Sequence, residues 1–380
     1  ALVLLIASAL LIRSFDRLRH VDPGYETQDL FTFQFAPEEE YLKDAPSFAR
    51  FHLEFKERLA ALPGVERVGV VENVPLDESV SSERFQSEAT AGDDDSGTLL
   101  SFTWTAGDYF RAMGIEVLGG RIFTDDDHLT HPGNVLVSRS AANLLWPGQD
   151  PVGKRLRMRN RETWETVVGV VDDVLQDSFR QAAEPMVYFP LVGQDPANSR
   201  PISSPGYVLK TRRADEIAPE VRALVRQVAP TAPMYRVYTM ERLAARSMTD
   251  LSFTSLTLGV ASGLALILGL VGLYGVLSYA VAERTREIGL RMALGAAASR
   301  VRGMVVGQGA KVLMAGILAG TAAAFLATRA LGSLLFEVGT FDLSTYLIVT
   351  GLLVLVGLAA SYLPARRASK VDPMEALRSE

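Results

Sequence analysis

Three long stretches without a charged residue constrain the fold of this chain more than any other feature of its sequence. They comprise residues 251–282, 312–328 and 343–365. A helix of about 20 residues crosses the hydrocarbon core of a bilayer, with a usual range of roughly 17 to 25. The second and third stretches fit this range. The first has 32 residues and exceeds it, so we expect part of that helix to project from the membrane.

A fourth apolar stretch, residues 1–12, is too short to cross a bilayer by itself. As a helix it would extend about 18 Å at 1.5 Å per residue, whereas the hydrocarbon core is about 30 Å thick. One interpretation is the apolar part of a signal peptide, with Ala7-Ser8-Ala9 as a cleavage site. Because the apolar run continues through residues 10–12 into a helix-prone segment, we favour a transmembrane helix whose beginning is missing from the sequence.

The distribution of Lys and Arg predicts how the helices are oriented, because short basic loops stay on the cytoplasmic side. Residues 283–311 contain six basic and two acidic side chains, and residues 366–380 contain four and three. Residues 329–342 contain one basic and two acidic side chains. We therefore expect the first two segments in the cytoplasm and the third outside. The residues between the short stretch 1–12 and the stretch 251–282 then form one large external domain.

The net charge of −6 averages two unlike parts of the chain. Residues 1–282 carry 27 basic and 37 acidic side chains, whereas residues 283–380 carry 11 and 7. The large acidic part would repel phosphate, which excludes a basic nucleic-acid-binding protein. An apolar content of 48% argues against a disordered chain. Because the sequence has no cysteine, it forms no disulfide, no thiolate metal site and no cysteine nucleophile.

Two β-α-β patterns occur in the external domain, separated by a long insert. In the first, Phe31, Phe33 and Phe35 alternate with polar residues and predict a half-buried strand; an amphipathic helix and a strand over 65–71 follow. In the second, strand-like residues 207–211 and 234–239 flank another helix. The apolar positions of the two helices are Phe48, Phe51, Phe55, Leu59 and Leu62, and Ile217, Val221, Leu224, Val225 and Val228. Together the units predict a split ferredoxin-like layer.

The insert, residues 76–204, is expected to form a second, β-rich lobe. The predicted strands are 135–137, 156–158, 166–171 and 186–189, with a short helix around 138–145. Asp93-Asp94-Asp95 is interpreted as a solvated loop. After the second β-α-β unit, Leu243, Ser247, Met248 and Leu251 continue at helical spacing. This pattern predicts one stalk helix that runs from the external domain into the membrane.

Residues 148–155, Gly-Gln-Asp-Pro-Val-Gly-Lys-Arg, nearly match a phosphate-binding Walker A loop. The last position is Arg155, where a Ser or Thr must reach Mg²⁺, and no strand-loop-helix context is apparent. We therefore interpret the segment as a Pro/Gly turn between strands.

Asp125-Asp126-Asp127-His128, with His131, could supply ligands to a metal ion. Their spacing matches no zinc or EF-hand pattern, so a solvated acidic loop is the favoured interpretation. The sequence contains no Gly-x-Ser-x-Gly nucleophile elbow and no carboxylate pair that stands out from ordinary surface acid. We therefore expect no catalytic residue and no metal ligand in this chain.

Glycines with small-xxx-small spacing occur in or beside the apolar stretches. Such spacing lets helices approach closely in lipid. The pairs are Gly259 and Gly263, Gly303 and Gly307, and Gly316 and Gly320. Packing among helices of one chain and a dimer seam both remain open as explanations, with Gly259, Gly263, Gly316 and Gly320 as the candidate seam.

Residues 283–294 have a helical pattern beyond what a connecting loop requires. Glu287 and Arg291 have the i,i+4 spacing of a stabilising ion pair, and Gly295 is placed to end the helix. A second amphipathic pattern leads into the apolar stretch 312–328 through Val301, Met304, Val305 and Gln308. The simpler interpretation is a basic loop that only sets the topology. The alternative is a helix that docks into a soluble partner and passes movement from a cytoplasmic motor to the membrane helices.

Several motifs resemble those of a known protein family. Residues 285–296, TREIGLRMALGA, resemble the cytoplasmic segment of FtsX-like ABC permeases, and residues 362–378, YLPARRASKVDPMEALR, resemble their C-terminal signature. Residues 107–115 (GDYFRAMGI), 119–121 (GGR) and 146–154 (WPGQDPVGK) resemble the MacB-like periplasmic core domain. The combination is most similar to the tandem permeases of acidobacterial type, in which two four-helix units share one polypeptide.

The resemblance implies a multi-domain permease of the bacterial inner membrane. It would have four transmembrane helices, the first truncated here, and an α+β periplasmic domain with a split ferredoxin-like lobe and an inserted β-rich lobe. A separate cytoplasmic ATPase would hold ATP and Mg²⁺, with no cofactor on this chain. The residues implied to contact it are Arg286, Glu287, Ile288, Gly289, Arg291, Met292, Leu294 and Gly295.

The resemblance also implies further partners and two possible functions. The partners are membrane lipid and a second permease unit, as a homodimer or a tandem pair; a periplasmic adaptor is a further candidate, and no nucleic acid is expected. The leading function is ATP-driven efflux or export. The alternative is a mechanotransmitting protein for signalling or sensing that moves no substrate.

These expectations divide the chain into three parts. Residues 1–20 are the truncated first helix and stalk. Residues 21–240 are the periplasmic core domain, with one lobe over 21–75 and 205–240 and the inserted lobe over 76–204. Residues 241–380 are the FtsX-like permease domain: stalk and second span 241–282, coupling loop 283–311, third span 312–328, external loop 329–342, fourth span 343–365 and tail 366–380.

Overall fold

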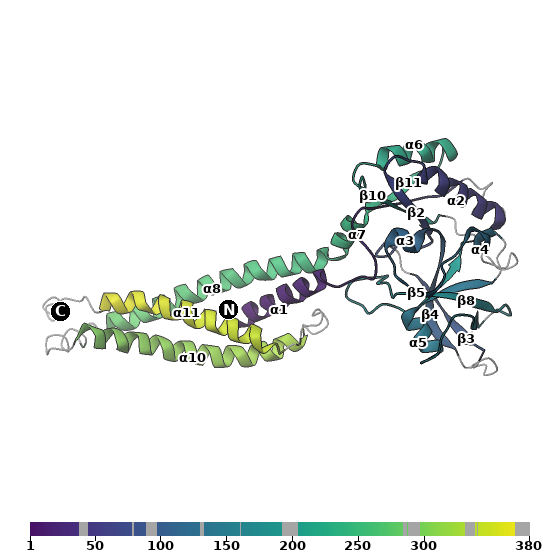
Figure 1. Cartoon of the computed structure of the whole chain (residues 1–380). Helices are drawn as coiled ribbons and strands as arrows, with labels where there is room; N and C mark the ends of the chain where they lie inside the picture. Colours follow the sequence, from purple (N-terminus) through teal and green to yellow (C-terminus); the bar gives the residue numbers. More distant parts are fainter. Residues whose placement is uncertain are drawn as a thin grey trace. The chain divides into compact units, whose positions relative to one another are not determined.

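The computed structural model of the chain contains two compact units, one of helices and one built on a sheet (Figure 1). The helical unit comprises Ala1–His20 and Thr249–Glu380, and the other unit comprises Val21–Met248. The structure describes residues 1–37, 45–77, 80–88, 97–129, 133–159, 161–191, 204–283, 287, 297–330, 339 and 341–368.

Four long helices form the helical unit. They are α1 (Leu2–Arg19), α8 (Thr249–Glu283), α10 (Ala298–Ala330) and α11 (Leu343–Ala368). Among the described residues, three helices are long and apolar enough to cross a membrane, over Leu256–Glu283, Ser299–Arg329 and Leu343–Arg366. These correspond to the three uncharged stretches. The helix α10 begins well before the stretch 312–328 because the amphipathic residues after Ala298 continue the same helix.

The helix α1 is not among those three spans. It has 18 residues, and its second half carries Arg13, Asp16, Arg17 and Arg19. It nevertheless packs against α8, α10 and α11, and the four helices form one bundle.

The second unit is built on a sheet of eleven strands. The strands are β1 (Leu30–Phe35), β2 (Val65–Val71), β3 (Ser81–Ser87), β4 (Thr98–Gly107), β5 (Val117–Gly120), β6 (Asn134–Ser138), β7 (Arg155–Met158), β8 (Glu165–Val171), β9 (Met186–Pro190), β10 (Gly206–Thr211) and β11 (Met234–Thr239). The helices are α2 (Ala45–Ala60), α3 (Tyr109–Met113), α4 (Asp125–Leu129), α5 (Arg139–Leu145), α6 (Ala218–Val228) and α7 (Met240–Ser247). The strands and helices expected at these positions from the sequence are confirmed.

The two β-α-β units supply four neighbouring antiparallel strands in the order β11-β1-β10-β2. In this layer Phe33 pairs with Tyr207, and Phe35 pairs with Met234. The prediction that β1 is half-buried is wrong, since Thr32 and Gln34 are 1% and 2% exposed. The reason is that α7 packs against β1 and α3 packs against β2 and β10, so the polar side of the strand is covered as well.

The remaining strands continue the sheet and close on themselves. Hydrogen-bonded pairings run from β4 through β3, β7, β8, β6 and β9 and return to β4, while β5 adds to β8. The strand β4 also pairs with β2, where Val70 lies opposite Ala106. It therefore belongs both to the ring and to the four-stranded layer. The sequence patterns did not predict β3, β4 or β5.

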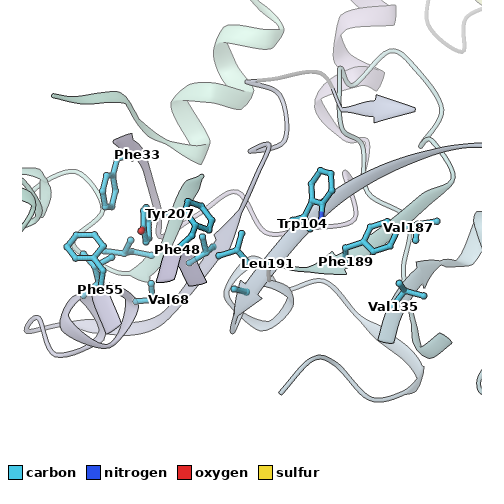
Figure 2. Close-up of a cluster of buried hydrophobic side chains, with 14 of the residues drawn as sticks. Phe33, Phe48, Phe55, Val68, Trp104, Val135, Val187, Phe189, Leu191 and Tyr207 are labelled. Carbon is cyan, nitrogen blue, oxygen red and sulfur yellow. The ribbon is translucent and has the colours of Figure 1, made fainter. Parts of the chain in front are cut away.

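One hydrophobic core extends under both parts of the sheet (Figure 2). At one end lie Phe33, Phe55 and Tyr207, and at the other end lie Trp104 and Phe189. Residues that alternate with them along β10 and β2, such as Val208 and Val71, belong to a second core on the opposite face. The sheet is thus buried on both sides where the two parts meet.

The predicted continuous stalk helix is wrong as stated. The helix α7 ends at Ser247, and α8 begins at Thr249. At the break, the backbone N–H of Met248 donates to the carbonyl of Ala245 at 3.2 Å, a bond to the third residue back that tightens a helix end. The stalk pattern therefore covers two helices.

Residues 148–155 form a turn, as expected, but the turn joins α5 to β7 and does not lie between two strands. Gly148 and Gly153 have φ of +69° and +84°, which glycine adopts without strain. A strand follows the turn where a phosphate-binding loop requires the start of a helix. The separate acidic run at Asp93–95 lies outside the described residues.

The prediction of a solvated acidic loop at residues 125–128 is wrong. These residues begin α4, and Asp127 and His128 are each 1% exposed. Asp127 accepts hydrogen bonds from Arg121 at 2.6 and 3.1 Å and from Asn134 at 2.7 Å. Burial raises the pKa of Asp127, but these bonds outweigh that effect and hold it well below its usual range. His131 lies outside the described residues.

Candidate functional site in the helix bundle

Small and polar side chains form the seam between α1 and α8. Ser262 on α8 donates a hydrogen bond from Oγ to the backbone carbonyl of Leu4 at 2.8 Å, and it also reaches the carbonyl of Leu258. A Cβ atom placed on Gly259 would lie 3.6 Å from Oγ of Ser8. Glycine and serine let helix backbones approach closely, and a hydrogen bond across the seam adds to the packing.

The apolar side of α1 fills the centre of the bundle. Leu2, Ile6 and Leu10 pack with Ala324 of α10 and with aromatic and branched residues of α11. Those residues of α11 are Tyr346 and Val349. The helix α1 thus contacts each of the other three long helices.

An ion pair fixes the end of α1 against the start of α11. Arg13 Nη1 lies 2.6 Å from Asp342 Oδ2 and also donates to Oγ of Ser344. The same carboxylate accepts from the backbone N–H of Thr345 at 3.1 Å, which is the bond that an N-cap residue makes. The bonds from Thr345 and Ser344, with the charge of Arg13, lower the pKa of Asp342.

The helices α10 and α11 approach each other tightly at two glycines that the sequence patterns did not single out. A Cβ on Gly309 would lie 2.6 Å from Oγ of Ser361, and one on Gly357 would lie 2.6 Å from a methyl group of Leu313. Gly357 and Ser361 have small-xxx-small spacing. A search that included serine as a small residue would have found this pair.

Some of the predicted glycines lie against a neighbouring helix, and others do not. Gly259 approaches Ser8, and a Cβ on Gly320 would lie 3.0 Å from Leu2, so both face α1. The others have no atom of the described chain within 4 Å of a Cβ position: Gly263, Gly303, Gly307 and Gly316. A role for these positions in contacts with a second molecule stays a prediction.

The segment implied to contact an ATPase lies mostly outside the described residues. Glu287 is described, and it is helical and exposed. The other seven implied contact residues lie outside the described part of the chain: Arg286, Ile288, Gly289, Arg291, Met292, Leu294 and Gly295. The segment joins the end of α8 at Glu283 to the start of α10 at Ala298.

The seam between α1 and α8 joins the two helices that flank the sheet-containing unit in the sequence. The helix α1 ends at Arg19, just before the unit that begins at Val21, and α8 starts at Thr249, just after that unit ends at Met248. The helices α1 and α8, which pack through Ser8, Gly259 and Ser262, are therefore the two helices that the chain connects to the two ends of the sheet-containing unit.

Two family models match this chain over most of its length. Residues 7–232 match the MacB-like periplasmic core domain, and residues 259–373 match the FtsX-like permease C-terminal domain. These matches agree with the boundary between the sheet-containing unit and the helices that follow it.

Similar proteins come from several bacteria. A macrolide export ATP-binding/permease protein MacB of Agrobacterium fabrum is 30% identical over 73% of this chain and 43% of its own length. The ABC transporter permease YknZ of Bacillus subtilis is 26% identical over 72% of this chain and 68% of its own length. The chain thus spans about two-fifths of the MacB relatives. The solved periplasmic region of MacB from Actinobacillus actinomycetemcomitans aligns with 61% of this chain and 98% of its own, at 13% identity and a TM-score of 0.41.

The family models, the three membrane-capable helices and the β-rich domain lead to one assignment. This chain is a multi-pass membrane protein and belongs to the family of ABC transporter permeases with a MacB-like periplasmic core domain and an FtsX-like permease domain.

Proposed function

We propose that this chain is the permease unit of a MacB/FtsX-type exporter, in which ATP hydrolysis on a separate cytoplasmic subunit drives movement of the periplasmic domain for efflux. The observation that carries the proposal is the seam between α1 and α8. In this seam, a hydrogen bond joins the helix that precedes the Val21–Met248 unit in the chain to the helix that follows it. Movement of either helix would therefore reach that unit through the pair.

The proposed topology has four spans in the bacterial inner membrane, with α1 as part of the first. Val21–Met248 lies in the periplasm, with a ferredoxin-like lobe built on the order β11-β1-β10-β2 and an inserted lobe built on the ring of strands. Residues 283–311 lie in the cytoplasm. The basic composition of that segment supports this orientation.

The proposed partners follow from the family. The MacB relatives are named as ATP-binding/permease proteins, and the YknZ relative is named as a permease. We assign ATP and Mg²⁺ to a separate ATPase subunit. A second permease unit, as a homodimer or a tandem pair, membrane lipid and a periplasmic adaptor complete the proposed assembly.

The proposed transmission begins at residues 286–295 and passes along α8. A helix of 35 residues extends about 52 Å, so it is long enough to reach across the membrane. The hydrogen bond of Ser262 and the close contact at Gly259 would pass that displacement to α1.

The test removes the proposed ATPase contact without touching the bundle. In the triple variant Glu287→Ala, Arg291→Ala and Leu294→Ala, we expect co-purification with the cognate ATPase to fall by at least about tenfold, because ion pairs and a buried apolar anchor usually dominate such contacts. The membrane insertion of the variant should be unchanged.

The matched control is the double variant Arg300→Ala and Arg302→Ala, which removes two charges from the start of α10. We expect it to retain the ATPase. Unchanged co-purification of the triple variant would contradict the proposal. A measurement of substrate efflux in vesicles that contain both subunits then separates export from transmission without transport.

A further inference from the structure

A hollow of about 380 Å³ lies at the C-terminal end of α6, beside the loop that leads to β11. Its walls include the side chains of Arg222, Val225 and Arg226 from the helix and those of Pro230, Pro233 and Met234 from the loop and strand. In Figure 1, α6 lies at the periphery of the Val21–Met248 unit.

The wall of the hollow is rigid. Val225 is 1% exposed and belongs to the main core. Met234 is held by its pairing with Phe35 in the sheet, and Pro230 and Pro233 restrict the loop because proline fixes φ. A preformed hollow loses less conformational entropy when a ligand binds than one that must be ordered first.

The charge around α6 is opposite to that of the rest of the domain. Residues 21–204 carry 16 basic and 31 acidic side chains, whereas residues 205–248 carry 8 basic and 4 acidic ones. Six of these eight cations have partners. Lys210 pairs with Glu26, Arg212 with Glu66, Arg213 with Glu220, Arg236 with Asp77 and Arg242 with Asp215, and Arg246 lies over the ring of Tyr238.

Arg222 and Arg226 are the other two of the eight basic side chains in residues 205–248. Within the described part of the chain, neither guanidinium has an acidic partner, and both side chains are exposed. Within the described residues, one hydrogen bond joins them, from Nε of Arg226 to the backbone carbonyl of Arg222 at 3.4 Å, and it leaves the terminal nitrogens of both side chains available. Their i,i+4 spacing places them on the same side of α6.

We propose that this hollow, the α6 pocket, binds an acidic segment of a partner polypeptide. Each guanidinium fork matches the geometry of a carboxylate, so two acidic side chains would be held by Arg222 and Arg226. An apolar side chain between them would enter the hollow and contact Pro233 and Met234. A hydrated inorganic anion would leave these two apolar residues without a contact.

The acidic surroundings favour a short peptide segment over an extended polyanion. The rest of the domain has an excess of 15 negative charges, which would repel a nucleic acid or an anionic lipid surface. A segment with only two or three acidic residues fits the local positive charge. The site does not depend on ATPase coupling, so it goes beyond the proposed function.

The experiment uses the full chain in nanodiscs of phosphatidylcholine, which carries no net charge. The probe is a fluorescein-labelled peptide that contains Glu-Leu-Glu, and its binding is measured by fluorescence anisotropy at about 50 mM salt, where charge interactions are weakly screened. The double variant Arg222→Gln and Arg226→Gln should weaken binding by at least about tenfold, since two charge-assisted hydrogen-bonding groups are lost. The same peptide with Gln-Leu-Gln should bind the wild-type chain with a similar loss.

The matched control is Arg212→Gln with Arg242→Gln, which removes two exposed but paired arginines from the same basic segment. It should change binding by less than about twofold. An equal loss in both double variants would show a general charge effect and overturn the α6 pocket. The same conclusion follows if Arg222→Gln with Arg226→Gln has no effect, or if inorganic phosphate displaces the peptide at concentrations below about 1 mM.

Discussion

At the scale of single residues, Glu165 is an ionisable side chain in a buried position, where its charged form is unfavourable. The residue is 6% exposed, and within the described part of the chain its Oε2 atom has no hydrogen-bond partner. Burial raises the pKa of Glu165 to about 7. The folded chain therefore binds a proton between about pH 4.5 and 7 that the unfolded chain releases, and stability falls as the pH rises through that window.

The substitution Glu165→Gln should remove this pH dependence. At pH 8 we expect the free energy of unfolding to increase by about 1 to 3 kcal/mol, because no charge has to be buried. At pH 4.5 the difference from the wild type should disappear. Thermal unfolding of the full chain in detergent at the two pH values measures both. Glu162→Gln at an exposed neighbour is the control, and an equal effect at both pH values would contradict the assignment.

His52 shows the opposite dependence on pH. It is fully buried beside Phe48 and Phe51, and its Nδ1 atom bonds with the hydroxyl of Tyr207. Burial lowers the pKa of His52 to about 3. As the pH falls below about 6.5, the unfolded chain takes up a proton that the folded chain excludes, so stability falls with acidification.

The variant His52→Phe should therefore lose less stability than the wild type when the pH is lowered from 7 to 5. The difference should be about 2 kcal/mol. Denaturant unfolding at the two pH values gives the slope for each protein, and His20→Gln at an exposed position serves as the control. Identical slopes for wild type and His52→Phe would rule out His52 as the source.

At the scale of elements, the alternation along β1 and the apolar spacing of α2 and α6 could be predicted because they depend only on neighbours in the chain. The burial of Thr32 and Gln34 could not, since it depends on α3 and α7. The strand β4 was missed although its residues 101–106 alternate between polar and apolar side chains, which is the pattern of a half-buried strand. Its parallel pairing with β9 joins distant segments, such as Thr103 with Tyr188.

In the helix bundle, too, the sequence predicts the helices but not how they pack. The uncharged stretches predicted three helices, and glycine spacing predicted close contacts, but only packing decides which glycines face a neighbour. Gly309 faces Ser361 and Leu277, whereas Gly307 has no atom of the described chain within 4 Å of a Cβ position. Two glycines on one helix therefore differ in whether they contact a neighbouring helix, and the sequence does not reveal this difference.

This difference predicts unequal effects of the same substitution. Gly309→Leu should destabilise the bundle by about 1 to 3 kcal/mol, the usual effect of overpacking. Gly307→Leu should change stability by less than about 0.5 kcal/mol. The melting temperatures of both variants in the same detergent measure the contrast, and equal melting temperatures would contradict the observed packing.

At the scale of the whole molecule, the absence of native cysteine allows the seam between α1 and α8 to be tested by crosslinking. In the pair Ser8→Cys and Gly259→Cys, the distance between the side chains suits a disulfide, because a Cβ on Gly259 would lie 3.6 Å from Oγ of Ser8. We expect this pair to form a disulfide readily on oxidation.

The pair Ser8→Cys and Gly263→Cys is the matched control, since Gly263 has no atom of the described chain within 4 Å of its Cβ position. It should crosslink much more slowly. If α1 and α8 move as one body, the crosslinked 8/259 protein should retain its ATP-driven activity in vesicles. Loss of activity that is restored by reduction would show that the two helices slide past each other.

The strand β4 has a mechanical consequence for the domain. It is hydrogen-bonded to β2 in the four-stranded layer and to β3 and β9 in the ring, and a single core lies beneath both. A hinge between the layer and the ring would have to separate several backbone bonds at once and expose that core. A pull on either end of the domain would therefore be shared along β4 as a shear load between the layer and the ring.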